Sequence, residues 1–439
     1  MTLSAIASSP AAQWQPLAAA PLSGQGADLA LTGRVISDGF LGFGACFNEL
    51  GWQALSRAGG NARQEALGRL FGPGQGCDFS YCRLPMGAND FAASWYSYCE
   101  TPGDFALESF SVARDEEGVL PFLRAAQALR PDPIRLFASP WSPPTWLKFP
   151  AVYNYGHLIA EPRYLQTYAA YFVKYLQAYA ALGFDVGAVH VQNEPDSDQK
   201  FPSCRWTGAE LAEFIGSYLG PAFAAAGVST EIWLGTIERG EFNAWVGRVM
   251  SDPAAARYVR GLGFQWAGKG AIQRSHQAFP DLPIIQTESE CGDGKNDWPF
   301  AHYVFDLIHH YLTNGARSYV YWNMALPGGA TGNAASTWGW KQNSLISVDM
   351  ASGALSYNPE FWIMRHFGQF VRPGASVLEL QGRMSANALC FRNPDGGLVM
   401  VVQNPLDRER SVRIADRAGA ALTLPPASVT TVCIGATAL

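Results

Sequence analysis

The sequence has few charged residues, no long hydrophobic run and no paired cysteine motif. Only 15% of its 439 residues are charged, and 31 Lys plus Arg stand against 37 Asp plus Glu, which gives a net charge of -6. No basic run could follow a phosphate backbone, so the sequence predicts no nucleic-acid partner. No stretch of about 18 consecutive apolar residues occurs, so it predicts no membrane span.

The eight cysteines contain no C-x-x-C pair, which argues against a zinc ribbon or a redox motif. Buried free thiols are the favoured interpretation, and a disulfide between Cys77 and either Cys82 or Cys99 is the alternative. The first basic residue is Arg34, so no secretory signal is visible at the start of the chain.

Apolar and aromatic residues are abundant. Hydrophobic residues make up 48% of the chain, enough to bury a large core, and aromatic residues make up 13%, with 14 Trp and 17 Tyr. Flat aromatic faces are suited to the apolar faces of sugar rings, although aromatic residues also fill protein cores.

Eight apolar segments in the middle of the chain predict strands, and most of them end in polar residues or proline. They alternate with amphipathic segments that predict helices, one of which begins at a capping box, Thr207-Gly208-Ala209-Glu210. This alternation predicts a parallel sheet, and eight strands close a (β/α)8 TIM barrel. The predicted strands are 39–49, 79–85, 134–140, 187–195, 231–236, 261–266, 283–288 and 317–323; the main predicted helices are 55–70, 119–129, 164–182, 208–219, 297–314 and 360–370.

Beyond residue 370 the pattern changes to short alternating runs separated by turn residues, which predicts an all-β domain. Residues 28–36 alternate in the same way and are expected to join it, after a loose N-terminus. We therefore predict a β-sandwich side domain built from both termini. The predicted division is an N-terminal segment at 1–38, a catalytic barrel at 39–370 and the sandwich at 371–439.

Polar side chains stand at the predicted carboxyl ends of the barrel strands, where substrates of TIM barrels bind. Glu194 ends strand four and Glu288 ends strand seven, so the two carboxyl groups are expected to face each other across the barrel. An acid on one side of a glycosidic bond and a carboxylate on the other are what glycoside cleavage requires, with retention or inversion set by their separation. The other residues at the strand ends include Asn48, Glu49, Arg83, Ser139, Trp141, Asn193, Gln265, Trp266, Trp322 and Asn323.

Six stretches resemble glycoside hydrolase family 30, which includes glucosylceramidases and microbial β-1,6-glucanases. The combination of SPWSPPTWLK and QNEP is specific, and the stretches span the barrel from its first strand to its last. They are GFGACFNEL (42–50), CRLPMGAND (82–90), FASPWSPPTWLK (137–148), VQNEP (191–195), TESE (287–290) and YWNMAL (321–326).

The resemblance implies a retaining mechanism with Glu194 as acid/base and Glu288 as nucleophile. It also implies that Asn193 binds the sugar 2-hydroxyl and that Arg83 lies near the nucleophile and keeps it ionised. The remaining predicted substrate-binding residues are Asp90, Trp141, Trp266, Trp322 and Asn323, of which Asp90, Trp141 and Trp322 match positions that line the terminal sugar pocket.

Two positions depart from the family pattern, and one residue competes with Glu288. Gln265-Trp266-Ala267 stands where relatives of glucosylceramidase carry His-Trp-Tyr, so a tyrosine hydroxyl that would hold the nucleophile is missing. Glu49 replaces an aspartate found in many relatives. Glu290, two residues beyond Glu288, is the alternative nucleophile, but Thr287 favours Glu288.

The predicted partner is a carbohydrate, with no cofactor and no metal. His190 and Glu194 have i, i+4 spacing, but on a strand they would lie about 13 Å apart, so no metal site follows. The competing hypotheses are a carbohydrate-binding protein on an inactive hydrolase scaffold and a metal-dependent hydrolase on the same barrel.

The sequence leaves the sugar open among β-glucoside or β-1,6-glucan, β-xyloside, β-fucoside and β-galactan. Exo or endo action is expected to depend on the loops at 87–108, which carries Trp95, Tyr96 and Tyr98, and at 331–340, which carries Trp338 and Trp340. The family is commonly exported, so a secreted or periplasmic location is favoured over a cytoplasmic one. No oligomeric state is predicted.

Overall fold

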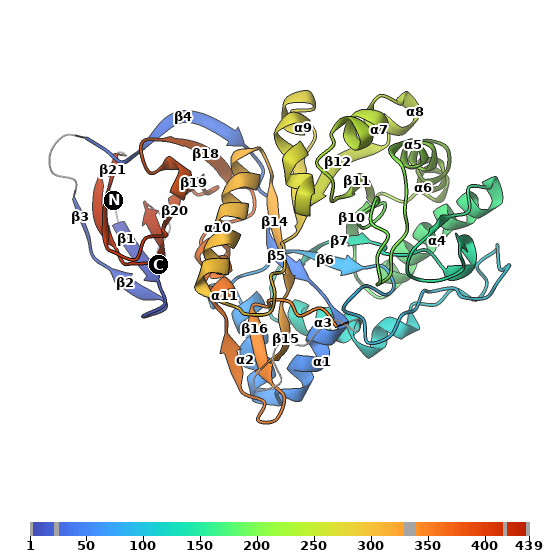
Figure 1. Cartoon of the computed structure of the whole chain (residues 1–439), viewed down its shortest axis with the longest axis horizontal. Coiled ribbons are helices and arrows are strands. Elements are labelled where there is room, and N and C mark those ends of the chain that lie inside the picture. The colour runs from blue at the N-terminus through green and yellow to red at the C-terminus, as the bar shows by residue number, and fades with distance from the viewer. Residues whose placement is uncertain (1–2, 22–25, 329–338, 416–418, 436–439) are drawn as a thin grey trace.

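In the computed structural model, eight parallel strands form a closed barrel (Figure 1). The structure describes residues 3–21, 26–328, 339–415 and 419–435. Hydrogen bonds from Arg317 N to Ile284 O (2.7 Å) and from Ser289 N to Val320 O (2.9 Å) join the last strand pair and close the ring. The strands are β5 Gly42–Cys46, β6 Tyr81–Pro85, β7 Arg135–Ser139, β10 Val186–His190, β11 Glu231–Ile237, β12 Val259–Gln265, β13 Ile284–Glu288 and β14 Ser318–Asn323. The (β/α)8 barrel predicted from the alternation is confirmed.

Helices surround the barrel, and two of the predicted ones are interrupted. The predicted helix at 55–70 is two helices, because Ala58 ends the first and Gly59 adopts a φ of 85° before the second. The capping box at Thr207 is formed, but a π-helical segment, η3 Phe214–Leu219, separates α5 from α6. The helices are α1 Glu49–Arg57, α2 Gly60–Phe71, α3 Val119–Gln127, α4 Pro162–Ala181, α5 Gly208–Glu213, α6 Gly220–Ala226, α7 Arg248–Met250, α8 Pro253–Ala256, α9 Ile272–Ala278, α10 Trp298–Thr313 and α11 Pro359–Gly368.

The side domain is a ten-stranded sheet to which both ends of the chain contribute. From the N-terminal end come β1 Leu3–Ser8, β2 Gln15–Leu17, β3 Ala19–Pro21 and β4 Leu29–Ser37. From the C-terminal end come β18 Ser376–Gln381, β19 Ala388–Arg392, β20 Leu398–Asn404, β21 Arg410–Ala415, β22 Ala420–Leu424 and β23 Ser428–Ile434. The predicted all-β side domain from both termini is confirmed, whereas its exact boundaries stay a prediction.

The expectation of a loose N-terminus is wrong for β1. This strand lies inside the sheet, where it pairs antiparallel with β23 on one side and with β2 on the other. Ala5, Ile6 and Ala7 are buried there. Short Ala and Ser side chains give little periodic signal, and the strand is stabilised by a partner from the opposite end of the chain.

Helices α10 and α11 lie between the sandwich and the barrel (Figure 1). The buried imidazole of His366 on α11 lies within hydrogen-bond distance of Thr431 Oγ1 (2.8 Å) and Ser8 Oγ (3.0 Å), which come from β23 and β1. The side domain is therefore packed against the barrel through groups from both termini. None of the helices in the described residues is both long enough and apolar enough to cross a membrane.

The loop at 87–108 is held by a buried carboxylate. The Asp115 carboxylate accepts hydrogen bonds from the hydroxyls of Tyr96 (2.6 Å), Tyr98 (2.8 Å) and Tyr179 (2.6 Å). Tyr96 and Tyr98 therefore fix the loop from inside, and Trp95 packs edge-on against Tyr153. The remaining short strands are β8 Lys148–Phe149, β9 His157–Leu158, β15 Ala325–Gly328, β16 Ile346–Asp349 and β17 Leu355–Tyr357.

Candidate active site

Two cavities of the described residues lie near the ends of the barrel. The larger, of about 880 Å³, lies at the starts of the strands and is lined by residues such as Ser80, Arg135 and Arg372. The smaller, of about 330 Å³, lies at the carboxyl ends of the strands, where TIM-barrel enzymes carry their active sites. Six of the nine predicted site residues line the smaller cavity: Asp90, Trp141, Asn193, Glu194, Trp266 and Glu288.

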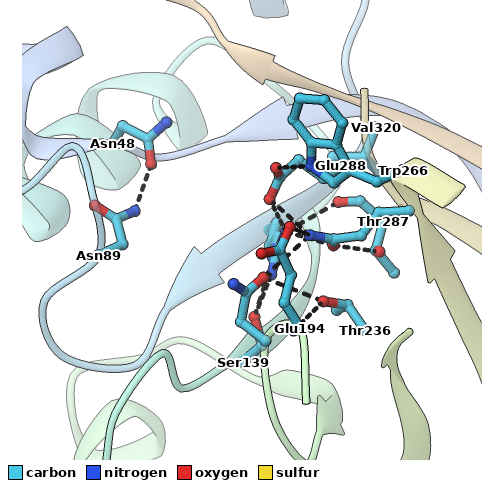
Figure 2. Close-up of polar contacts among 12 residues, drawn as sticks. Asn48, Asn89, Ser139, Glu194, Thr236, Trp266, Thr287, Glu288 and Val320 are labelled. Atoms are coloured by element: carbon cyan, nitrogen blue, oxygen red, sulfur yellow. Dashed lines mark hydrogen bonds and ion pairs between the residues drawn. The ribbon is translucent and has the colours of Figure 1, made fainter. Parts of the chain in front are cut away.

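The carboxyl groups of Glu194 and Glu288 are joined by the side chain of Gln265. Its Nε2 donates to Glu194 Oε1 (3.1 Å) and to Glu288 Oε2 (3.2 Å). The distance between these two oxygen atoms is therefore at most about 6.3 Å. Figure 2 shows both carboxyl groups within one network of polar contacts. They are 8% and 6% exposed, respectively, so both are largely removed from water.

The backbone around Glu194 is fixed by neighbouring strands. Asn193 N donates to Pro140 O (2.8 Å), and Glu194 N donates to Thr236 O (3.1 Å). Glu194 itself has a φ of 47°, a left-handed conformation that an ordinary side chain adopts only when its surroundings impose it. The turn between β10 and Pro195 therefore presents the Glu194 carboxyl group to the cavity.

Glu288 receives three hydrogen bonds, and they act unequally on its two oxygen atoms. Arg83 NH1 (2.8 Å) and Gln265 Nε2 donate to Oε2, and the indole Nε1 of Trp266 donates to Oε1 (3.1 Å). Burial raises the pKa of Glu288 to about 7, Arg83 opposes this rise, and the charge of Glu194 adds to it. Burial also raises the pKa of Glu194, which receives fewer donors. The pair therefore holds a proton near neutral pH, and the donors favour the charge on Glu288.

Arg83 lies beneath the cavity and connects its parts. Its side chain is fully buried and donates to Ser139 Oγ (2.8 Å) and Asn193 Oδ1 (2.7 Å) as well as to Glu288. Its guanidinium lies 4.4 Å from the ring centroid of Trp141, a cation–π contact. Arg83 thus orients both Asn193 and Glu288, and it lies beside Glu288.

Asn193 uses its oxygen atom within the protein. Oδ1 accepts from Arg83, from Thr236 Oγ1 (3.1 Å) and from Gln265 Nε2 (3.2 Å). No hydrogen bond from its Nδ2 to another described residue is found, and the residue lines the cavity. The NH2 group is therefore available to a ligand.

Two predicted residues, Trp322 and Asn323, lie one layer behind the cavity wall. Trp322 stacks on Trp141 with ring centroids 5.6 Å apart and is 1% exposed. Asn323 is fully buried, accepts from Asn48 Nδ2 (2.9 Å) and donates to Gln342 Oε1 (2.9 Å). Neither lines the cavity, so their positions support the wall and do not reach a ligand directly.

The residues at the two departures from the family pattern make hydrogen bonds or ion pairs within the protein. At the first, the side chains of Gln265 and Trp266 both donate to Glu288. Their N–H groups therefore hold the carboxyl group that the missing tyrosine hydroxyl would hold. At the second, Glu49 accepts from Ala93 N (2.9 Å) and pairs with Arg114 (2.8 Å), which holds the 87–108 loop. Ala267 lines the cavity in place of the family's tyrosine, whereas Glu49 does not line it.

Glu290, the alternative to Glu288, faces elsewhere. Its carboxylate accepts from Lys269 Nζ (2.6 Å) and from the hydroxyl of Tyr303 (2.8 Å), and it does not line the cavity. The geometry therefore favours Glu288.

Part of the cavity wall could not be predicted from the sequence. The sequence predicts that β11 ends at Thr236, whereas the strand continues to Ile237 and is followed by Glu238 and Arg239. Trp340 lines the cavity, whereas Trp338 lies outside the described residues, as does most of the 331–340 loop. The residues of the wall that were not predicted are Ser197, Gln199, Phe201, Glu238, Arg239, Ala267 and Gln342.

The described residues contain no group of three or more His, Cys, Asp or Glu side chains placed to hold a metal ion. His190 is fully buried in the barrel, below the cavity, where it packs between Phe137 and Trp233. All eight cysteines are buried and free, so no disulfide joins Cys77 to Cys82 or Cys99.

A closed (β/α)8 barrel with two buried carboxyl groups and tryptophan walls at this end of its strands is the architecture of a glycoside hydrolase. Comparison with known proteins identifies the family. Residues 40–371 match the TIM-barrel domain of glycosyl hydrolase family 30, and residues 374–432 match the β-sandwich domain of the same family. The chain belongs to glycosyl hydrolase family 30 and is a β-glycoside hydrolase.

Among relatives, lysosomal acid glucosylceramidase of Mus musculus is 29% identical over 383 residues, covering 80% of this chain and 72% of its own. Endo-1,6-beta-D-glucanase neg1 of Aspergillus fumigatus is 27% identical over 425 residues, covering 89% and 84%. Among solved structures, SrfJ from Salmonella typhimurium superposes with a TM-score of 0.88 at 25% identity, covering 99% of both chains. The endo-beta1,6-glucanase BT3312 superposes with a TM-score of 0.87 at 24% identity, also over 99% of both chains, and supports the fold.

Proposed function

We propose that the protein is a retaining β-glycosidase in which Glu288 is the nucleophile and Glu194 the acid/base. The observation that carries this proposal is the pair of hydrogen bonds from Gln265, which limits the separation of two carboxyl oxygens to about 6.3 Å. Inverting enzymes need roughly 6.5 to 9.5 Å to admit a water molecule, whereas retaining enzymes have roughly 5 to 5.5 Å.

The two roles follow from the hydrogen bonds. Arg83, Gln265 and Trp266 favour the ionised form of Glu288, which attacks the anomeric carbon. Glu194 keeps the proton and transfers it to the glycosidic oxygen as that bond breaks, which leaves the sugar covalently bound to Glu288. Glu194, now ionised, takes a proton from water, the water oxygen attacks the anomeric carbon, and Glu288 leaves as a carboxylate.

The remaining groups of the cavity suit a sugar. The free NH2 of Asn193 is placed to donate to the 2-hydroxyl, the largely buried carboxyl of Asp90 to bind other hydroxyls, and Trp141 to pack against the ring. The relatives named as glucosylceramidases and endo-1,6-β-glucanases favour a β-glucoside or a β-1,6-glucan, with β-xyloside, β-fucoside and β-galactan as alternatives.

Proton NMR during early hydrolysis tests the stereochemical outcome. With an aryl β-glucoside, the β-anomer of glucose is expected to appear first and the α-anomer only later, through mutarotation. If the α-anomer forms first, the enzyme inverts and Glu288 is not a nucleophile. Release of nitrophenol from a panel of aryl β-glycosides also distinguishes the enzyme from a binding protein, and turnover in excess EDTA distinguishes it from a metal-dependent hydrolase.

Replacing Trp266 with phenylalanine is expected to raise the lower pH limit of kcat/KM by about one unit. The indole N–H lowers the pKa of Glu288, so its loss raises that pKa, and Glu288 becomes ionised only at higher pH. The measurement is a pH profile with an aryl β-glucoside. Trp298→Phe on α10, outside the cavity, is the matched control, and equal profiles for both variants would show that the indole N–H does not act on Glu288.

A further inference from the structure

The hairpin of β8 and β9 exposes a group of apolar side chains. Of the five large hydrophobic side chains that are exposed in the described residues, three lie in its loop, residues 149–155: Phe149 at 67%, Val152 at 37% and Tyr155 at 40%. Single exposed apolar residues are ordinary in a folded protein, whereas a local group of them marks a binding surface. The clustering in one loop therefore indicates that the loop binds a partner.

This loop lies beside the proposed substrate cavity. It belongs to the segment that follows β7, so it is at the carboxyl ends of the barrel strands, as the cavity is. Asn154 pairs with Pro202 in an antiparallel bridge, and Pro202 directly follows Phe201, which lines the cavity. Paired strands lie about 5 Å apart. Tyr155 is therefore separated from Phe201 by one residue step on each strand and one strand spacing.

Hydrogen bonds fix the loop on the segment that forms this part of the cavity wall. The buried ammonium group of Lys148 donates to Tyr153 O (2.9 Å) and to Ser203 O (2.5 Å). Ser203 N donates to Tyr153 O (3.0 Å), and Ser203 Oγ accepts from Tyr155 N (3.0 Å). The backbone of the loop is therefore ordered before a ligand binds, which lowers the entropy cost of binding.

The surface of the loop suits a neutral sugar chain. Residues 149–158 contain no Asp, Glu, Lys or Arg, so they present no charge to an anionic lipid headgroup or to a charged chain. On the neighbouring segment Asp198 and Lys200 have opposite charges, which leaves no excess of either sign there. The exposed rings of Phe149 and Tyr155 are suited to the apolar faces of sugar rings, and the tyrosine hydroxyl to a sugar hydroxyl.

We propose that residues 149–155 form a second sugar-binding surface, which holds a neutral β-glucan chain while one of its glucosyl units occupies the cavity. This inference rests on the proposed function, because the chain is the substrate of Glu194 and Glu288. Continuity with the cavity through Phe201 favours a further part of the substrate over an unrelated partner. Binding at the loop raises the effective concentration of the chain at the cavity, so the preferred substrate has several sugar units.

The double variant Phe149→Ala, Tyr155→Ala tests the proposal by the ratio of two kcat/KM values. One is for a soluble linear β-1,6-glucan, the polymer that the glucanase relatives favour, and the other is for an aryl β-glucoside, which is too short to reach the loop. The ratio is expected to fall at least about tenfold, because two ring contacts are lost. The fall is expected in a higher KM for the polymer with its kcat retained, since the lost contacts are equal in the ground state and the transition state.

Two variants serve as matched controls. Phe149→Trp with Tyr155→Phe keeps both rings and is expected to restore the wild-type ratio. Met350→Ala with Leu406→Ala removes the two exposed large hydrophobic side chains of the described residues that lie outside the loop, and it is expected to leave the ratio unchanged.

Binding is also measured without turnover, in Glu288→Ala. Affinity electrophoresis in gels that contain the β-1,6-glucan is expected to show retardation, which the two alanine substitutions in the loop reduce. A loss of retardation with the rings intact in the tryptophan and phenylalanine variant would contradict the role of the rings.

An unchanged ratio in the double alanine variant, an equal loss with both substrates, or a wild-type protein that neither binds nor hydrolyses the polymer overturns the inference. The anomer released from the aryl β-glucoside decides the proposed function separately, so the two failures are distinguished. Sedimentation with phosphatidylcholine vesicles that contain glucosylceramide tests a lipid surface as the partner. If the alanine substitutions abolish vesicle binding and leave the ratio unchanged, the loop binds lipid and the inference is wrong.

Discussion

Glu288→Ala is expected to lower kcat for an aryl β-glucoside by at least about 10⁴-fold, the largest effect of any single substitution in the cavity. The variant has no group that can form the covalent intermediate. A loss of this size corresponds to roughly 5 kcal/mol of transition-state stabilisation. Arg83 and Trp266 donate to Glu288 in the structure, and in the variant their donors are expected to face the vacated position.

Those donors make the variant responsive to small anions. Azide can occupy the space of the missing carboxylate and attack the anomeric carbon of an activated aryl β-glucoside, which gives the α-glucosyl azide. The expected result is a rate that rises with azide concentration, with the product identified by NMR. Glu290→Ala is the matched control, since Glu290 pairs with Lys269 and Tyr303 outside the cavity, and it is expected to retain most activity. The opposite pattern, with turnover lost in Glu290→Ala and kept in Glu288→Ala, would move the nucleophile to Glu290.

The barrel was predictable because its strands are short, apolar and ended by polar residues or proline. Parallel barrel strands are buried on both faces, so a run such as 187–191 followed by Gln192, Asn193 and Glu194 marks both the strand and its carboxyl end. The common direction of the strands then places their ends together, which is why Glu194, Glu288 and Arg83 meet in the structure.

The sequence pattern does not show whether a residue at a strand end lines the cavity or lies behind the cavity wall. Trp141 lines the cavity and Trp322 supports it from behind, yet both stand just beyond or at the end of a strand. The difference depends on how the two rings stack and on the fully buried Arg83 between strands. Glu238 was missed for a different reason, because β11 continues to Ile237, one residue beyond its predicted end.

Strands β1, β2 and β3 could not be predicted from the sequence, because their stability comes from distant partners. Only β4 of the four has the length and alternation that predict a strand, whereas β2 and β3 have three residues each. Their pairing with β1 and with β22 is a property of the assembled sheet. The local sequence pattern contains little information about such distant contacts.

Glu194→Ala is expected to slow the hydrolysis of phenyl β-D-glucoside by about 10² to 10⁴-fold, because the leaving oxygen then departs without a proton. The effect depends on the leaving group. With 2,4-dinitrophenyl β-D-glucoside, glycosylation stays fast while water attack is slow, so a burst of dinitrophenol and an accumulated glucosyl-enzyme on Glu288 are expected. Glu213→Ala, an exposed carboxyl on α5, is the control and is expected to match wild type.

Azide separates the roles of the two carboxyl groups by stereochemistry. In Glu194→Ala the covalent intermediate still forms on Glu288, so azide attacks from the opposite face and gives the β-glucosyl azide. In Glu288→Ala azide attacks the substrate directly and gives the α-glucosyl azide. Because Gln265 holds both carboxyls in one hydrogen-bonded set, loss of either changes the environment of the other, and rates alone do not assign the roles. The anomeric configuration of the glucosyl azide assigns the roles, and an α-glucosyl azide from Glu194→Ala would exchange the two assignments.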